Sequence, residues 1–315
     1  MTMVVAGGAG FLGSHLCDAL ALRGHHIVIL DDLSSGSRDN IAGLLDQGHE
    51  LIECDVSKGV PAIPNVRGVF NFASPASPPR YQERPLETLA VGSEGTRHLL
   101  ELATASGVRF LQASTSEIYG DPLEHPQSER YWGNVNPVGP RSVYDEAKRF
   151  GETLTTAYRH ARGTNTAIAR IFNTYGPRLN PADGRSVSNF MSQALMGRDL
   201  TVYGDGLQTR SLIYVSDQIR GLLALFDTTH PGPMNIGSQD ELTVREIAEA
   251  VLSVTESPSK IVFCDLPEDD PSRRRPDISL AREVLGWEPT TQLRDGLIAL
   301  RDDYIARKIA REGEN

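Results

Sequence analysis

The chain has 315 residues, of which 39% are hydrophobic, and this is enough to bury a sizeable core in one large domain or two closely joined ones. Its formal net charge of −10 argues against a nucleic-acid-binding protein, and no apolar run reaches the ~20 residues that a membrane-spanning helix needs. The three cysteines (Cys17, Cys54, Cys264) lack metal-ligand spacing, and the apolar strand that starts at Met3 leaves no room for a signal peptide, so we expect a cytoplasmic protein without a metal.

The N-terminal residues alternate as strand, glycine-rich turn, helix and strand. Residues 3–6 form a short apolar strand, residues 7–13 read GGAGFLG, an apolar-periodic helix follows, and a second buried strand at 27–30 ends at Asp31. Glycines let backbone N–H groups approach a pyrophosphate at a helix N-terminus, and the acid can accept hydrogen bonds from a ribose 2′-hydroxyl. The pattern predicts a dinucleotide site that prefers NAD, because an acid repels the 2′-phosphate of NADP; the alternative is a tight turn without a ligand.

Strands and helices continue to alternate along the first half of the chain. We expect strands at 51–54, 69–73, 108–113 and 167–171, a loop at 74–79, and a helix at 86–105 that two glycines weaken. Asp55 and Val56 are placed to flank an adenine, unless they merely end a strand. The strand at 108–113 delivers Ser114–Glu117 to the carboxyl edge of the sheet, where ligands bind in open α/β folds. The glycine turn and this hydroxyl-rich segment therefore open onto one crevice.

Tyr144 and Lys148 lie four residues apart in a helix that we expect to run to about Arg162. Four residues are about one helical turn, so both side chains lie on one helix face. The lysine is expected to lower the tyrosine pKa from its usual ~10, so that a phenolate takes a proton from an alcohol while Thr115 shares it. Taken alone, a tyrosine and a lysine at this spacing are more often a chance feature of a solvated helix face than a catalytic pair.

The remaining residues complete an α/β prediction. Residues 120–141 contain several prolines and no periodicity, which indicates a long loop of the kind that often carries function. Shorter elements are expected near 186–197, 199–203, 212–226, 243–254 and 292–308. We predict a Rossmann-like doubly wound parallel sheet in residues 1–172, completed by a segment near 210–235, and a smaller C-terminal α/β domain that consists mainly of residues 173–315 and closes over the crevice.

The glycine turn, Asp31, Thr115 and the Tyr144–Lys148 pair together resemble the extended short-chain dehydrogenase/reductase family over essentially the whole chain. That family acts largely on nucleotide sugars with tightly held NAD, so the resemblance implies a C-terminal domain that binds a nucleotide sugar. Longer motifs are similar to those of its UDP-glucuronate decarboxylases: 114–122 (STSEIYGDP), 131–137 (YWGNVNP), 171–178 (IFNTYGPR), 188–190 (SNF), 200–204 (LTVYG) and 269–277 (DDPSRRRPD).

The triplet Thr115-Ser116-Glu117 distinguishes the members of this family by the reaction that they catalyse. Enzymes that dehydrate a hexose usually carry Thr-Asp-Glu, in which the Asp protonates the leaving hydroxyl, and the epimerases typically lack the Glu. The resemblance favours NAD-dependent decarboxylation of UDP-glucuronate through a UDP-4-keto intermediate to UDP-xylose, with release of UDP-4-keto-pentose left open. A UDP-sugar 4-epimerase or 4,6-dehydratase is the alternative, and a non-catalytic nucleotide-sensing protein is a third hypothesis. A homodimer is expected, in which helices near 86–105 and 143–161 pack across a two-fold axis.

The resemblance also implies roles for individual residues. Tyr144 would take the hydroxyl proton, and Lys148 would tune the pKa of Tyr144 and hold the nicotinamide ribose. Thr115 would orient the sugar 4-hydroxyl. Ser116 and Glu117 would position the sugar ring and help to transfer the proton at carbon 5, and Arg274 would bind the sugar carboxylate. Without this resemblance, the triplet of arginines at 273–275 would be interpreted as a solvated face. Arg178 and Arg210 are candidates for the pyrophosphate, and Tyr81, Tyr203 and Tyr214 either contact uridine or sugar or are ordinary half-buried tyrosines.

We therefore predict two sets of contacts besides the catalytic residues. The cofactor set is Gly7, Gly10, Phe11, Leu12, Gly13, Asp31, Asp32, Ser35, Gly36, Asp55, Val56, Phe72, Ser74, Tyr144 and Lys148. The substrate set is Tyr81, Glu117, Asn173, Arg178, Tyr203, Arg210, Tyr214 and Arg274.

The sequence departs from the decarboxylase pattern at several positions. Residues 90–92 read Ala-Val-Gly where Lys-Thr-Asn is usual, so a cation expected near the sugar is missing. Asn71 replaces a usual His, Asp32 a usual Asn, and Ala147 a usual Gly. These three lie near the expected cofactor site, where they bear on how tightly NADH is held.

Overall fold

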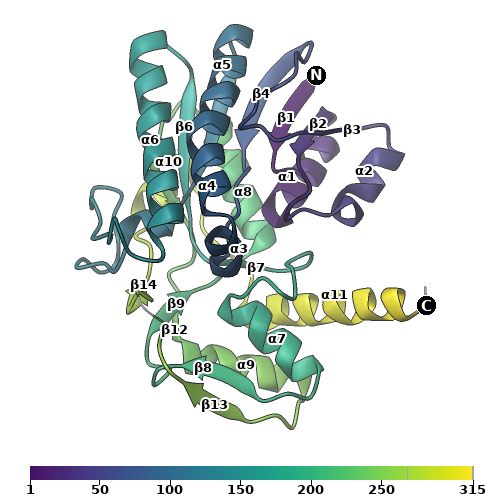
Figure 1. Ribbon diagram of the computed structural model, residues 1–315, viewed down its shortest axis with the longest axis vertical. Helices are drawn as coiled ribbons and strands as arrows, with labels where there is room; N and C mark the ends of the chain where they lie inside the picture. Colours follow the sequence, from purple (N-terminus) through teal and green to yellow (C-terminus); the bar gives the residue numbers. More distant parts are fainter. Residues whose placement is uncertain (268, 314–315) are drawn as a thin grey trace.

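A seven-stranded sheet forms the centre of the N-terminal part of the chain in a computed structural model that describes residues 1–267 and 269–313 (Figure 1). All of its neighbouring strands run parallel, in the order β11-β6-β5-β4-β1-β2-β3. The strands are β1 (Thr2–Ala6), β2 (His26–Asp31), β3 (Glu50–Glu53), β4 (Val66–Asn71), β5 (Arg109–Thr115), β6 (Thr166–Ile171) and β11 (Met234–Ile236). The predicted doubly wound parallel sheet is confirmed.

Helices cover both faces of the sheet, which explains why its strands are almost continuously apolar. On one face lie α1 (Phe11–Leu22), α2 (Ala42–Asp46), α8 (Val215–Phe226) and α10 (Ser279–Leu285). On the other lie α4 (Pro85–Ala90), α5 (Thr96–Ser106) and α6 (Ser142–Arg162). Helix α8 and strand β11 show that chain beyond residue 210 returns to this sheet.

Two expectations for the segment after β4 need correction. The predicted loop at 74–79 ends early, because Pro78 begins helix α3 (Pro78–Glu83). Proline fits the first turn of a helix, where its missing N–H would have no partner. The predicted helix at 86–105 is present but is interrupted by a π-helical turn, η2 (Val91–Gly95), between α4 and α5.

Two of the departures from the decarboxylase pattern, Gly92 and Ala147, meet in space. A Cβ atom at Gly92 would lie 2.7 Å from the Cβ of Ala147 on α6. That separation is too short for two carbon atoms, so an alanine at 147 requires a glycine at 92 unless the helices move apart. The two replacements therefore compensate for each other in the packing of η2 against α6.

The C-terminal part has its own hydrophobic core and lies below the sheet in Figure 1. Its larger elements are α7 (Ser186–Leu195), α9 (Val244–Thr255), α11 (Leu293–Gly313) and the parallel pair β8 (Leu200–Tyr203) and β13 (Ile261–Cys264). Smaller sheets join β12 (Glu241–Thr243), β9 (Thr209–Ser211) and β14 (Arg273–Arg274), and β7 (Thr174–Tyr175) with β10 (Ile213–Tyr214). The sequence did not predict these two- and three-residue strands.

The topology places a crevice at the carboxyl ends of β1 and β4. Strands β2 and β3 follow on one side of β1, whereas β4, β5 and β6 follow on the other, so the crossover direction reverses between β1 and β4. Ligands of open α/β sheets bind outside such a switch point. Two short 3-10 turns, η1 (Arg38–Ile41) and η3 (Ser116–Tyr119), lie after β2 and β5. Among the described residues, no helix has both the length and the apolar character to cross a membrane.

Candidate active site

A cavity of about 1020 Å³ lies at the carboxyl edge of the sheet, between the sheet and the C-terminal part of the chain. Its lining includes every residue of the predicted cofactor set. From the predicted substrate set it includes Tyr81, Glu117, Asn173, Arg178, Tyr203, Arg210 and Arg274. Segments far apart in the sequence therefore converge on one cavity, although the contacts of each residue with a ligand stay a prediction.

The glycine-rich turn closes tightly on itself and leaves its helix open to an anion. A Cβ atom at Gly13 would lie 2.0 Å from the Gly7 carbonyl oxygen, and Gly7 has a left-handed φ of 75°. Helix α1 begins after Gly10, and no side chain in the described part of the chain caps its first N–H groups. Free N–H groups at a helix N-terminus favour a phosphate, and this close approach is possible only with glycine.

Asp31 ends β2 inside the cavity. Its carboxylate accepts hydrogen bonds from the backbone N–H groups of Ala9 and Leu33, both at 2.9 Å. Burial raises the pKa of Asp31, and these two hydrogen bonds oppose that shift. Each carboxylate oxygen keeps a free lone pair for a ribose hydroxyl. The residues present therefore fit a dinucleotide: an uncapped helix terminus for the pyrophosphate and an acid at the end of the second strand.

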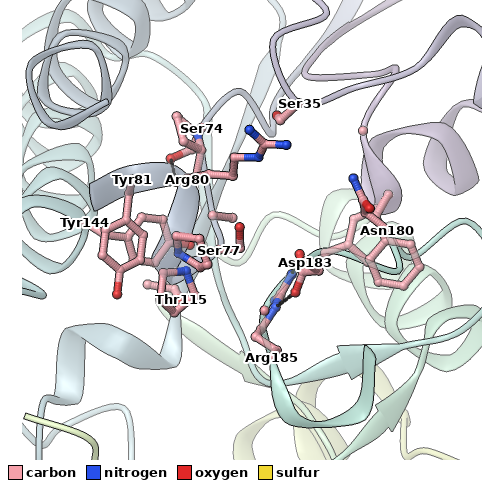
Figure 2. Close-up of a pocket in the computed structure, with 18 of the residues that line it drawn as sticks. Ser35, Ser74, Ser77, Arg80, Tyr81, Thr115, Tyr144, Asn180, Asp183 and Arg185 are labelled. Carbon is pink, nitrogen blue, oxygen red and sulfur yellow. Dashed lines mark hydrogen bonds and ion pairs between the residues drawn. The ribbon is translucent and has the colours of Figure 1, made fainter. Parts of the chain in front are cut away.

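Tyr144 and Lys148 share the inner face of α6, as the four-residue spacing predicts. Both are buried, the lysine Nζ lies 5.6 Å from the tyrosine ring centroid, and it donates a hydrogen bond of 3.1 Å to the Ala113 carbonyl. The Tyr81 ring of α3 stacks on Tyr144 with centroids 5.2 Å apart and planes 8° apart. Figure 2 shows these two rings beside Thr115. Tyr81, for which we predicted a contact with uridine or sugar, thus packs against Tyr144.

The expected lowering of the Tyr144 pKa is wrong for the protein by itself. Burial raises this pKa, the Glu117 carboxylate raises it further, and the Thr115 hydroxyl opposes them. The lysine instead shows the consequence of burial, which lowers the pKa of Lys148 to about 8. Desolvation penalises both charged forms, so the lysine alone does not produce a phenolate.

Glu117 lies in the 3-10 turn that follows β5, between two arginines. Arg141 donates to one carboxylate oxygen at 2.6 Å, and Arg274 forms an ion pair with the other while it donates to the Gly120 carbonyl at 2.9 Å. Burial by itself would raise the pKa of Glu117, but the charges of Arg274 and Arg141 hold that pKa well below its usual value. The carboxylate is therefore ionised at neutral pH. Arg274 is buried, so the interpretation of the arginine triplet as a wholly solvated face is wrong at this position.

Sequence reasoning missed several arginines of the cavity, and two of them, Arg141 and Arg185, have clear ion-pair partners. Arg141 precedes α6 by one residue and is the partner of Glu117, and its only sequence signal was its place just before the predicted helix. Arg185 precedes α7 and is fixed by Asp183, which accepts a hydrogen bond of 2.9 Å. In Figure 2, Arg185 and Asp183 lie across the cavity from Tyr144 and Thr115.

Some predicted site residues lie outside the cavity or are paired with other side chains of the protein. Ser116 is buried and does not line the cavity, and Tyr214 is also outside its lining and packs against Tyr175 with ring centroids 5.7 Å apart. Arg178 and Arg210 line the cavity but are held in ion pairs with Asp18 at 2.7 Å and with Asp270 at 2.9 Å. In this arrangement both arginines share their charge with a carboxylate, and their contact with a pyrophosphate stays a prediction.

This geometry suits a dinucleotide-dependent enzyme that oxidises an alcohol. The glycine turn and Asp31 are placed for the dinucleotide, and the phenol of Tyr144 lies in the same cavity with an ammonium group and a hydroxyl near it. Proton transfer to such a phenol can accompany hydride transfer from the alcohol carbon.

The chain belongs to the NAD dependent epimerase/dehydratase family, whose model matches residues 3–237, and its cofactor is NAD. It is 48% identical to UDP-glucuronic acid decarboxylase 1 of Arabidopsis thaliana, over 98% of this chain and 70% of that protein. It is 45% identical to UDP-glucuronic acid decarboxylase 1 of Danio rerio, over 99% of this chain and 74% of that protein.

Solved structures show the same fold. A UDP-glucuronic acid 4-epimerase from Bacillus cereus, in complex with UDP-glucuronic acid and NAD, superposes with a TM-score of 0.86 at 28% identity, covering 98% of this chain and 100% of that one. A dTDP-glucose 4,6-dehydratase from Streptomyces venezuelae, with NAD bound, superposes with a TM-score of 0.88 at 26% identity, covering 98% of each chain. The scaffold is therefore shared by enzymes with different reactions, and the site has to distinguish them.

Proposed function

We propose that this protein decarboxylates UDP-glucuronate with NAD, through a UDP-4-keto intermediate, to UDP-xylose. The observation that carries the proposal is the ionised Glu117, held between Arg141 and Arg274 in the cavity that also contains Thr115, Tyr144 and Lys148. Relatives of 45% and 48% identity over nearly the whole chain are named UDP-glucuronic acid decarboxylases.

The alternative reactions on this scaffold are less well supported. A 4,6-dehydratase is expected to present an acid at position 116, but this chain has a serine there, with 1% of its surface exposed and outside the cavity lining. A 4-epimerase typically lacks the glutamate at 117, whereas here that side chain is fixed by two buried or half-buried arginines. A purely nucleotide-sensing protein would not need the intact Thr115, Tyr144 and Lys148.

The first half of the reaction oxidises carbon 4 of the sugar. Bound NAD would supply the acceptor for the hydride of carbon 4 and, once reduced, the donor for its return. Tyr144 takes the proton of the 4-hydroxyl, Thr115 orients that hydroxyl, and the ammonium of Lys148 favours the phenolate against the opposing effect of burial. The hydrogen bond from Lys148 to the Ala113 carbonyl on β5 fixes the position of the lysine side chain.

The second half follows from the ketone. A ketone at carbon 4 is β to the carboxylate on carbon 5, so CO₂ leaves as its bonding electron pair moves into the carbonyl to form an enolate. Tyr144 donates to the enolate oxygen, and Arg274 lies where it can bind the carboxylate before it leaves. Carbon 5 then takes up a proton, and Tyr144 returns its proton to the carbon 4 oxygen. With the hydride that reduced NAD would supply to carbon 4, the product is UDP-xylose and there is no net redox change.

A product assay tests the proposal. The purified protein is incubated with UDP-glucuronate, with and without added NAD, and CO₂ and the nucleotide sugar are followed by NMR. We expect CO₂ and UDP-xylose; UDP-4-keto-pentose with net NADH would instead identify early release of the intermediate. Tyr144→Phe should remove most activity, whereas the matched control Tyr158→Phe on the same helix, whose hydroxyl contacts Glu101, should retain it. Absence of CO₂ at any NAD concentration would exclude a decarboxylase.

We further propose a homodimer that forms through α4 and α6. Leu86 and Leu89 on α4 and Phe150 on α6 are exposed by 76%, 40% and 49%, which is unusual for large apolar residues on neighbouring helices. A second copy of this face would cover them. Leu89→Asp or Phe150→Asp should give a monomer in light scattering, whereas the control Leu207→Asp, exposed in the C-terminal part, should remain a dimer. A monomeric wild-type protein would exclude this assembly.

The domain division and the location of the protein stay proposals. We propose that residues 1–172, with the segment near 210–235, bind NAD and that residues 173–315 mainly bind the nucleotide sugar. The separate hydrophobic cores of the sheet and of the C-terminal part support this division. The three cysteines are free thiols, which supports a reducing, cytoplasmic location.

A further inference from the structure

A second cavity, of about 300 Å³, adjoins the active site on the far side of Glu117. The two cavities share Glu117, Arg141, Pro271 and Arg274, so the Glu117 ion-pair cluster separates them. The second cavity also touches exposed residues, among them Asn136 and Asp269, and it therefore reaches from the surface to the buried carboxylate.

Asp145 is the buried acid of this second cavity. It lies next to the catalytic tyrosine in sequence, but it faces the second cavity and does not line the main one. Only 5% of its surface is exposed, and its Oδ1 has no hydrogen-bond partner among the described residues. An unpaired buried carboxylate is costly, so the arrangement favours a carboxyl group that holds a proton.

The charges around Asp145 support this interpretation. Burial and the neighbouring Glu117 raise its pKa, Arg141 and Arg274 oppose them, and Glu146 on the same helix adds a smaller rise. The first turn of a helix favours an ionised acid, but burial outweighs this effect here. Glu117 has both arginines as direct partners and stays ionised, so one proton shared by the two carboxyl groups is held mainly on Asp145.

The proposed reaction needs a proton from outside. The sugar carboxylate leaves as CO₂ and a C–H bond replaces the broken C–C bond, so each turnover consumes one proton. The 4-hydroxyl proton that Tyr144 removes returns to the same oxygen at the end and cannot supply it. The main cavity has to hold both the dinucleotide and the nucleotide sugar, which leaves its mouth poorly suited to deliver solvent protons.

We propose that the second cavity is the proton entry of the active site, and that Asp145, acting through Glu117, holds the proton that carbon 5 of the sugar takes up. The proposal rests on the decarboxylation proposed above. The O–H bond of Asp145 breaks as the proton passes, through the carboxylate of Glu117, to carbon 5. There it forms a C–H bond with the electron pair that CO₂ left in the enolate, and solvent returns a proton to Asp145 through the second cavity.

The experiment separates oxidation of the sugar from protonation at carbon 5. The NAD-loaded enzyme is mixed with UDP-glucuronate, and NADH absorbance, CO₂ and UDP-xylose are followed in a single turnover across pH 5–9. For Asp145→Asn we expect NADH to form at a rate close to that of the wild type, while UDP-xylose formation slows by about 100-fold and NADH persists. In the wild type, UDP-xylose formation should fall as pH rises through the range in which Asp145 loses its proton, and the variant should lack this fall.

Two further variants complete the test. Glu146→Gln removes a nearby charge from the same helix outside both cavities and should keep the wild-type rates, while its pH profile should move slightly to lower pH because Glu146 contributes to the raised pKa of Asp145. Asp145→Glu keeps a carboxyl group and should recover a substantial part of the rate of UDP-xylose formation. This variant keeps the proposal testable if Asp145→Asn folds poorly. An Asp145→Asn enzyme with wild-type UDP-xylose formation, or one in which NADH formation slows equally, would overturn the proton entry alone. A wild-type enzyme that releases no CO₂ would remove the proposed function and the proton entry together.

Discussion

Replacement of Lys148 by methionine should stabilise the cofactor-free protein while it abolishes catalysis. Lys148 is buried, and burial lowers its pKa from 10.5 to about 8. Each pKa unit corresponds to ~1.4 kcal/mol, so holding the charged ammonium in this site costs the folded state about 3 kcal/mol at neutral pH. Methionine has a similar length and no charge, but it leaves the Ala113 carbonyl without the lysine donor, which costs about 1 kcal/mol. The net expectation for Lys148→Met is a gain of about 2 kcal/mol at pH 7.

The sign of the pH dependence follows from the same numbers. Between about pH 8 and pH 10.5 the unfolded chain keeps the lysine proton that the folded chain has lost, so wild-type stability rises with pH in this window. Above it both states are neutral and the penalty is gone. The advantage of Lys148→Met should therefore shrink as pH rises and disappear near pH 10.

Urea unfolding at pH 7 and pH 10, on protein freed of dinucleotide, measures the stability gain of Lys148→Met and its decrease with pH. Lys260→Met is the matched control, because Lys260 is exposed and its loss should change the free energy of unfolding by less than about 0.5 kcal/mol at either pH. A Lys148→Met protein that is less stable than the wild type at pH 7, or a difference that is the same at both pH values, would refute the desolvation argument. The decarboxylase activity of Lys148→Met should fall to background.

Three other changes test the site and the packing. Gly13→Ala puts a Cβ 2.0 Å from the Gly7 carbonyl oxygen, so it should lower stability by about 1–3 kcal/mol and weaken NAD binding in calorimetry; unchanged NAD affinity would contradict the close approach. Glu117→Gln removes the charge that Arg274 pairs with and should lower the urea midpoint and stop CO₂ release, and turnover at the wild-type rate would contradict its role. Gly92→Asn should destabilise the protein in thermal unfolding by about 1–3 kcal/mol, and Ala147→Gly in the same chain should recover most of the loss; equal midpoints for the single and the double variant would disprove the compensation.

The dinucleotide half of the site could be predicted from sequence because its signals are local. Glycines at fixed spacing between two apolar strands, followed by Asp31, specify one turn, one helix and one strand end, and the structure places them together in the cavity. The Tyr144–Lys148 pair is equally local, since one helical turn fixes their common face. Boundaries were less accurate where the chain used prolines to begin α3 or a π-helical turn to join α4 and α5.

Tertiary contacts decided what the spacing could not. Arg141 and Arg274 meet at Glu117 from segments that are far apart in the chain, and Arg274 arrives on β14, a two-residue strand with no periodic signal. The pKa of Tyr144 depends on burial beneath Tyr81 and on the distance to Glu117, and neither quantity is encoded in the four-residue spacing. The sequence by itself determined the dinucleotide fold and the phenol–ammonium pair, because short-range backbone geometry sets them. Only the folded chain decided which charges surround that pair, because electrostatic interactions depend on distance in space and on the exclusion of water.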